Sequence, residues 1–171
     1  MSSPFHIRAA SVGDAAELLE IYRPFVEEST VSFEIEAPSL EEFERRIDTA
    51  LRGWAWLVAE ADGRPVGYAY GSSHRSRGAY RYSVETSAYV HEDHRRRGMA
   101  RALYTRLFEA LRDRGYSSAY AGVTLPNDVS IAFHRRLGFQ PVGVFPRVGR
   151  KFGAWHDVAW LYRPLGEQPR R

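Results

Sequence analysis

The chain contains no cysteine among its 171 residues, which excludes disulfides, thiolate metal sites and covalent cysteine chemistry. Any thiol in its chemistry must therefore come from a ligand. The chain also lacks an apolar run close to the ~20 residues of a membrane-spanning helix, and its first residues do not resemble a signal peptide. We therefore expect a cytoplasmic protein with no membrane partner.

Lysine is also scarce: of the 24 lysine and arginine residues, only Lys151 is a lysine. The 21 acidic residues are interspersed with them, the net charge is only +3, and no extended basic tract appears. Positive charge concentrates at residues 95–97 and 170–171. This distribution suits one polyphosphate ligand better than a duplex, so we expect no nucleic-acid partner.

No composition break, repeat or low-complexity linker divides the chain, and 44% hydrophobic with 26% charged residues is ordinary for a globular protein. The length is sufficient for one domain with a sizeable core. We therefore expect a single domain over residues 1–171, with its core at about 5–163 and a short C-terminal tail.

Hydrophobic periodicity, capping residues and turn signals predict both helices and strands. Strands are expected at 5–10, 54–61, 64–72, 82–91, 117–123, 140–145 and 158–161. Helices are expected at 11–27, from 39 onwards, at 98–114 and at 130–137. The predicted buried faces of the first three helices are Leu18, Leu19, Tyr22 and Phe25; Leu40, Phe43, Ile47 and Leu51; and Ala100, Leu103, Leu107 and Leu111.

This order predicts an α/β (α+β) fold in which helices flank a mixed central β-sheet. The turn at 62–63, Asp-Gly, is a strong hairpin signal. The run at 119–123 alternates poorly between apolar and polar residues, as expected for a central strand buried on both faces.

The most informative segment is HRRRGMA at residues 94–100, which follows a predicted strand and opens a predicted helix. A helix N-terminus leaves backbone N–H groups unpaired and carries partial positive charge. Small residues at Gly98 and Ala100 let an anion approach the main chain, and three arginines strengthen the field. The segment therefore predicts a phosphate-binding loop, although a basic run before a helix is also common as a solvated turn.

A second segment, NDVSIAFHRRLGF at 127–139, reads as a short helix that Gly-Phe closes. Together the two segments resemble the GCN5-related N-acetyltransferases (GNAT), whose signature is Gln/Arg-x-x-Gly-x-Gly/Ala followed later by an Asn-led helix ending in Gly-Phe. Arg95, Gly98 and Ala100 match the first pattern, and residues 127, 138 and 139 match the second. The predicted element order is also the order of the GNAT fold.

Further segments resemble one group within this superfamily, the phosphinothricin and methionine sulfoximine acetyltransferases. They are STVSF at 29–33, VETSAYV at 84–90, LPND at 125–128 and WHDV at 155–158. Because they occur in the same order along the chain, the resemblance extends to about residue 163. It implies acetyl-CoA as cosubstrate, a small-molecule amine substrate and a homodimer.

The resemblance also implies which residues contact coenzyme A. The pantetheine arm of coenzyme A would pair with the backbone of the strand at 82–91. Its pyrophosphate would bind the loop and helix start at 94–101. The expected contacts are Ala88, Tyr89, Val90, Arg95, Arg96, Arg97, Gly98, Met99, Ala100, Arg101, Asn127 and Ser130. Asn127 could equally cap its helix.

Amide transfer from a thioester needs a neutral amine and a proton donor for the departing thiolate. Glu85 is a conspicuous carboxylate in an otherwise apolar or hydroxylated strand, and it is our candidate base, directly or through water; an exposed carboxylate or a salt bridge is the alternative. His134 stands where many GNAT enzymes carry a tyrosine acid, so it is a candidate acid, cofactor contact or packed imidazole. Tyr104 on the preceding helix is the rival acid.

Amino acids with a tetrahedral phosphorus or sulfur head need cationic donors and an aromatic wall. By resemblance, Arg75, Arg77 and Phe33 are expected to bind the substrate, with Lys151 as a weaker candidate. Trp155 and His156 could reach a pocket near a dimer interface. His91 and His94 have ligand-like spacing, but without cysteine or an obvious third ligand we expect no metal.

These observations predict acetyl-CoA-dependent acetylation of the α-amino group of phosphinothricin, methionine sulfoximine or methionine sulfone, by direct transfer in a ternary complex. Two alternatives remain open. One is acetylation of a peptide or protein N-terminus, which needs an open groove near Phe33 and Arg75. The other is a noncatalytic acetyl-CoA sensor, against which Glu85 is weak evidence.

Overall fold

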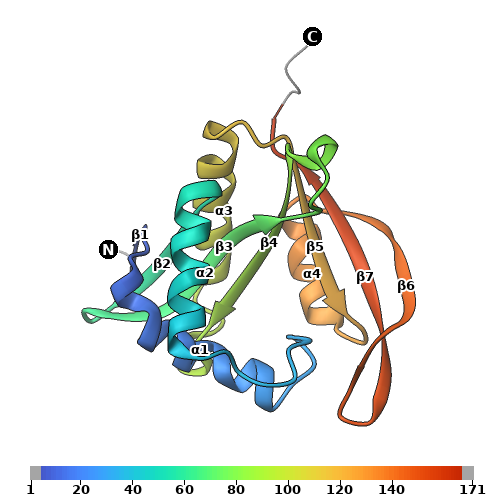
Figure 1. The fold of residues 1–171 in the computed structure, drawn as a ribbon, viewed down its shortest axis with the longest axis horizontal. Coiled ribbons are helices and arrows are strands. Elements are labelled where there is room, and N and C mark those ends of the chain that lie inside the picture. Colours follow the sequence, from blue (N-terminus) through green and yellow to red (C-terminus); the bar gives the residue numbers. More distant parts are fainter. Residues whose placement is uncertain (1–4, 167–171) are drawn as a thin grey trace.

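A computed structural model describes residues 5–166 of the chain. Seven strands form one sheet in the order β1-β2-β3-β4-β5-β7-β6. β4 and β5 run parallel, whereas the other neighbouring strands are antiparallel. Helices cover both faces of this sheet (Figure 1). The predicted mixed sheet flanked by helices is therefore confirmed.

The element order also follows the prediction. The strands are β1 (His6–Ala9), β2 (Trp56–Ala61), β3 (Arg64–Ser73), β4 (Ser83–Val90), β5 (Ser118–Thr124), β6 (Gln140–Lys151) and β7 (Ala154–Pro164). The α-helices are α1 (Ala15–Glu27), α2 (Leu40–Gly53), α3 (Met99–Asp113) and α4 (Asp128–Arg136). Short 3-10 helices are η1 (Val12–Asp14), η2 (Gly78–Tyr80) and η3 (Glu92–His94). None of the helices within 5–166 is both long and apolar enough to cross a membrane.

Two apolar clusters hold the layers together. α1 and α2 pack on one face of the sheet around Trp56 and Tyr68, and α3 packs on the other face. Leu103, Leu107 and Leu111 of α3 are 0% exposed, and burial of such a side chain contributes about 1.5–3 kcal/mol. This packing fixes α3 behind β3 and β4, and so fixes where its N-terminus lies.

The predicted helix ends form for the expected reasons. The N–H of Ser11 donates to the Asp14 carboxylate at 2.7 Å, and the N–H of Glu42 donates to the Ser39 hydroxyl at 3.1 Å. Gly115 ends α3 at φ +89°, where a residue without Cβ is least strained. Local sequence therefore determines these boundaries.

Four helix positions differ from prediction, and two of them, Phe25 and Leu51, are only partly buried. Leu40 is 44% exposed, because it is the first residue of α2 and lies outside the stripe that Phe43 and Ile47 bury. Ala100 is only partly buried, whereas Met99 beside it is 2% exposed and belongs to the core.

The expectation that the central strand 119–123 is buried on both faces is wrong. Ala119, Ala121 and Val123 belong to the α3-side core, but Gly122 is exposed and Tyr120 is only partly buried. α1 and α2 do not reach this part of the sheet (Figure 1). The uncovered face of β5 is therefore available to a ligand.

The last two strands are longer than predicted, because residues 146–151 and 154–157 continue as a hairpin. Pro146 and Gly149 resemble loop residues in the sequence, but β7 supplies a partner strand along this stretch. The register shifts between Phe145 and Gly149, and Arg147 adopts φ +49°. A bulge thus absorbs the irregular residues without ending the strand.

Candidate active site

β4 and β5 separate in the middle of the sheet. They pair only at Ser83↔Ser118, Val84↔Ala119 and Glu85↔Tyr120, and from Thr86 onwards the two strands diverge (Figure 1). β4 stays paired with β3 as far as Val90. In the described part of the chain, its other edge has no strand partner beyond Glu85, so main-chain polar groups there are free to pair with a ligand.

The predicted anion loop lies at the end of β4. Gly98 precedes α3 at φ +76°, Arg96 has φ +62°, and no side chain caps the helix. A Cβ built on Gly98 would meet nothing within 4 Å, so the approach to the first N–H groups is open. This geometry is suited to a phosphate.

The arginines of the loop are not equivalent. Arg95 Nε donates to the carbonyl of Val90 at 3.4 Å, and its guanidinium lies 5.3 Å from the centre of the Phe25 ring. Arg96 and Arg97 are exposed. The Met99 side chain is in the core, so only its backbone can contact a ligand. The Arg101 side chain lines a separate hollow of about 640 Å³ with Arg112, Arg136 and Arg163.

A cavity of about 80 Å³ occupies the opening between β4 and β5. It is bordered by residues of β4, β5, α3, α4 and the loop before α2. Among the predicted residues, it brings together Ala88, Tyr89, Tyr104, Asn127, Ser130 and His134. The Asn127 side chain caps α4 by accepting from the N–H of Ser130 at 3.1 Å, so its capping role and its place at the cavity are compatible.

The two rival acids, Tyr104 and His134, are partners. The Tyr104 hydroxyl lies 3.4 Å from His134 Nε2, and His134 Nδ1 lies 2.8 Å from the carbonyl of Ser130. Because a carbonyl only accepts, Nδ1 carries the hydrogen and Nε2 accepts from Tyr104. Burial lowers the pKa of His134, partly offset by the bond to Ser130, and burial raises the pKa of Tyr104. Both side chains are therefore neutral near pH 7.

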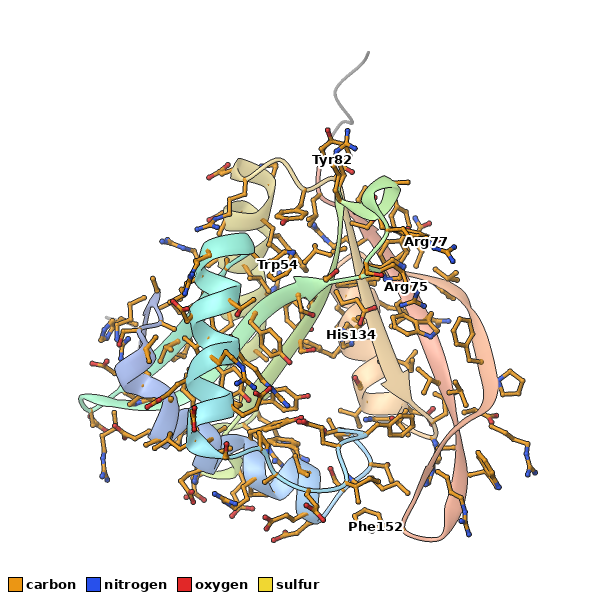
Figure 2. All side chains as sticks on the ribbon, viewed as in Figure 1. Trp54, Arg75, Arg77, Tyr82, His134 and Phe152 are labelled. Carbon is orange, nitrogen blue, oxygen red and sulfur yellow. The ribbon has the colours of Figure 1, made fainter. Side chains whose placement is uncertain are left out.

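Glu85 lies at the last pair before the strands diverge. Its Oε1 is 3.0 Å from His74 Nδ1 and 3.4 Å from Arg75 Nη1. Arg75 and Arg77 lie on the loop after β3, at the end of the opening where β4 and β5 are still paired (Figure 2). The structure thus brings Arg75 to Glu85, whereas Arg77 is exposed and has no such contact.

An apolar pocket of about 260 Å³ lies on the uncovered face of β5. Its walls are Val31, Phe33, Gly122, Thr124, Phe145, Val148, Val158 and Trp160. The Phe33 ring lies so close to Gly149 that any Cβ there would overlap it. Phe33 therefore lies at a pocket wall, and Gly149 provides the room for it.

Lys151 does not face this pocket. It is 3% exposed, and its Nζ donates to the carbonyls of Val26, Ser29 and Ser32. Burial lowers its pKa, which nearby Glu34 partly offsets. Each of the three N–H bonds of the ammonium has a carbonyl acceptor, so Lys151 links the loop that carries Phe33 to the β6–β7 hairpin. It has no donor left for a substrate.

Neither of the other two hairpin candidates lines the pocket, and the His156 ring lies 6.2 Å from that of Phe33. His156 Nε2 donates to the carbonyl of Lys151 at 3.1 Å, and Trp155 is 53% exposed under the guanidinium of Arg147.

We expect Lys151→Met to lower the free energy of unfolding by about 3 kcal/mol, since it leaves buried carbonyls without a donor. Urea denaturation against Arg150→Met, an exposed neighbour on the same strand, measures the difference. Equal midpoints for the two variants would show that the buried ammonium does not stabilise the loop.

Sequence reasoning missed His74, Val31, Gly122 and Trp160. The first of these follows β3 directly and precedes two predicted substrate arginines, so its position was a usable signal. Gly122 and Trp160 have no chemical signature, because only the β5–β7 register places them at the pocket. Val31 has none either, and it reaches the pocket from the loop before α2.

The opening fits coenzyme A on the grounds of the structure itself. The free edge of β4 offers main-chain groups for the amide-containing arm, and the open N-terminus of α3 offers N–H groups for a pyrophosphate. Between them, the cavity bordered by Tyr104 and His134 is a place for the reacting thioester.

Comparisons with known proteins agree with this geometry. Residues 7–160 match the family model described as acetyltransferase (GNAT) domain. Phosphinothricin N-acetyltransferase of Streptomyces viridochromogenes is 36% identical over 160 residues, 94% of this chain and 87% of that protein. L-methionine sulfoximine/L-methionine sulfone acetyltransferase of Salmonella typhimurium is 34% identical, over 94% of this chain and 95% of that protein.

Among solved structures, a GNAT superfamily phosphinothricin acetyltransferase from Sinorhizobium meliloti, in complex with AcCoA, superposes with a TM-score of 0.92. It is 35% identical, and the match covers 97% of this chain and 91% of that one. The chain therefore belongs to the GNAT family and is an N-acetyltransferase.

Proposed function

We propose that the protein transfers the acetyl group of acetyl-CoA directly to the α-amino group of a small amino-acid-like substrate, in a ternary complex. Phosphinothricin, methionine sulfoximine and methionine sulfone are the proposed substrates, in keeping with the names of the relatives. The observation that carries this proposal is the divergence of β4 from β5, which puts Glu85, the Tyr104–His134 pair and the open α3 terminus around one opening.

The chain holds the cosubstrate through its backbone. The N–H groups of residues 96–101 bind the pyrophosphate, and Arg96 and Arg97 add charge around it. Residues 88–90 pair with the arm along the free edge of β4. Bound acetyl-CoA supplies an activated acetyl thioester, which the amine attacks. Holding both reactants in one opening lowers the entropic part of the barrier.

Glu85 provides the carboxylate that draws the proton from the amine, directly or through an intervening group. As the thiolate departs, the Tyr104 hydroxyl turns its single hydrogen from Nε2 of neutral His134 to the sulfur. We assign the donor role to Tyr104 because burial lowers the pKa of His134, so an imidazolium acid would be costly here.

The substrate lies on the open face of β5. Phe33 and the other walls of the apolar pocket contact its methylenes, and Arg75 and Arg77 at the opposite end bind its carboxylate or tetrahedral head. Lys151 is left out of this site, because its three N–H bonds are already taken by carbonyls.

Mass spectrometry tests the direct transfer. After incubation with acetyl-CoA and methionine sulfone, we expect N-acetylmethionine sulfone, and a protein of unchanged mass when acetyl-CoA is added alone. A protein that gains one acetyl group before the amine is added, and then loses it to the amine, would contradict transfer in a ternary complex.

A further inference from the structure

His74, the residue directly after β3, forms a hydrogen-bonded pair with Glu85. Its Nδ1 lies 3.0 Å from Glu85 Oε1. An ionised carboxylate only accepts, so Nδ1 carries the hydrogen and Nε2 keeps its lone pair. In catalytic pairs of this kind, the carboxylate sets the tautomer of the imidazole and stabilises its protonated form.

The ring is held firmly. It stacks on the ring of Tyr120, with 4.7 Å between the ring centres and 17° between the ring planes. It meets the rings of Tyr80 and Trp160 edge-on, with 5.7 and 6.2 Å between the ring centres. Its side chain is only 16% exposed. Within residues 5–166, the ring makes no hydrogen bond other than the one to Glu85. Nε2 is also not one of the fully buried polar atoms that lack a partner, so it is accessible to solvent. A fixed imidazole thus offers one accessible lone pair.

The ring lies where the two halves of the proposed site meet. Tyr120, on which it stacks, pairs with Glu85 at the last rung before β4 and β5 diverge. Trp160, which it meets edge-on, is a wall of the apolar pocket, and Thr86 beside Glu85 borders the cavity of the opening. His74 therefore contacts residues on both sides of the proposed site, Trp160 at the pocket and Glu85 next to the opening.

The titratable and charged groups that face the ring come from each element around it. They are Glu85 of β4, Arg75 of the same loop, Tyr80 of η2 and Tyr120 of β5. Glu85 Oε1 already accepts from both His74 and Arg75. Imidazoles in general, with a pKa of about 6.5, match an amine of about 8 better than carboxylates of about 4.3 do.

We propose that His74 Nε2 takes the proton from the substrate amine and that Glu85 orients the ring and stabilises the imidazolium. This inference rests on the proposed function and deepens it. As the amine lone pair bonds to the thioester carbon, the C=O pair moves to oxygen and an N–H proton passes to Nε2. When the C=O bond re-forms, the C–S pair leaves with sulfur. The thiolate then takes a proton from solvent, or from Tyr104, whose phenolate is reprotonated by solvent. His74 returns its proton to solvent.

Two substitutions separate base chemistry from packing. His74→Ala removes the ring, and His74→Phe keeps an aromatic ring on Tyr120 but removes both nitrogens. We expect both to lower kcat by about 100-fold, to leave the KM for acetyl-CoA unchanged, and to lose the low-pH limb of kcat/KM that belongs to an imidazole. Added imidazole should restore part of the activity of His74→Ala, after subtraction of the reaction without protein. It should not affect His6→Ala, a variant at an exposed position on β1.

A His74→Phe variant with wild-type kcat would overturn the proposal, because packing alone would then suffice. The same holds if folded His74→Ala gains nothing from imidazole and keeps the wild-type pH profile. Failure of the proposed function can be distinguished from failure of this inference. In that case the wild-type protein would acetylate none of the proposed substrates: phosphinothricin, methionine sulfoximine and methionine sulfone.

Discussion

Replacing Gly98 with valine is expected to weaken acetyl-CoA binding by at least about 100-fold, or about 2.7 kcal/mol. Gly98 has φ +76° immediately before α3, a conformation that costs residues with a Cβ about 1–2 kcal/mol. The added side chain would also extend into the open space beside Gly98, where the proposed pyrophosphate site lies. Isothermal titration calorimetry with acetyl-CoA measures the loss.

Gly63→Val is the matched control. Gly63 has φ +74° and equally open surroundings, but it lies in the β2–β3 turn. It carries the same backbone strain, so both variants should lose similar thermal stability while only Gly98→Val loses affinity. Intact binding by Gly98→Val would refute the placement of the pyrophosphate.

Glu85→Gln is expected to lower kcat by about 10²–10⁴-fold, the usual range for loss of general base catalysis. The substitution keeps the shape of the side chain but removes the charge that faces His74 and Arg75. The KM for acetyl-CoA should not change, because Glu85 precedes the stretch of β4 that is expected to contact the cosubstrate. Steady-state kinetics across pH measures both constants.

Glu41→Gln, an exposed position on α2, should leave both constants as they are. If Glu85→Gln kept wild-type turnover over the whole pH range, Glu85 would have no part in proton removal.

The anion loop and the α4 cap could be predicted because their chemistry is local. A glycine at positive φ before a helix and an asparagine at a helix start act within a few residues, so the sequence displays them directly. The same applies to the caps at Ser39 and Gly115. The fold followed from the order of such signals and from the resemblance to a family.

The pairing of distant residues could not be predicted. His74 meets Glu85 only because of the β3–β4 register, which pairs Ser72 with Glu85. Lys151 meets the loop after α1 across more than a hundred residues. The open face of β5 depends on how far α1 and α2 extend, which no local pattern encodes. The homodimer and the cytoplasmic location stay predictions.

The first measurement to make is thiol release from acetyl-CoA with a panel of phosphinothricin, methionine sulfoximine, methionine sulfone, glutamate and a generic peptide. The account predicts saturable turnover with at least one tetrahedral-headed amino acid and little with the peptide. Acetyl-CoA binding without turnover would contradict it and indicate a sensor, and turnover of the peptide alone would indicate an N-terminal acetyltransferase.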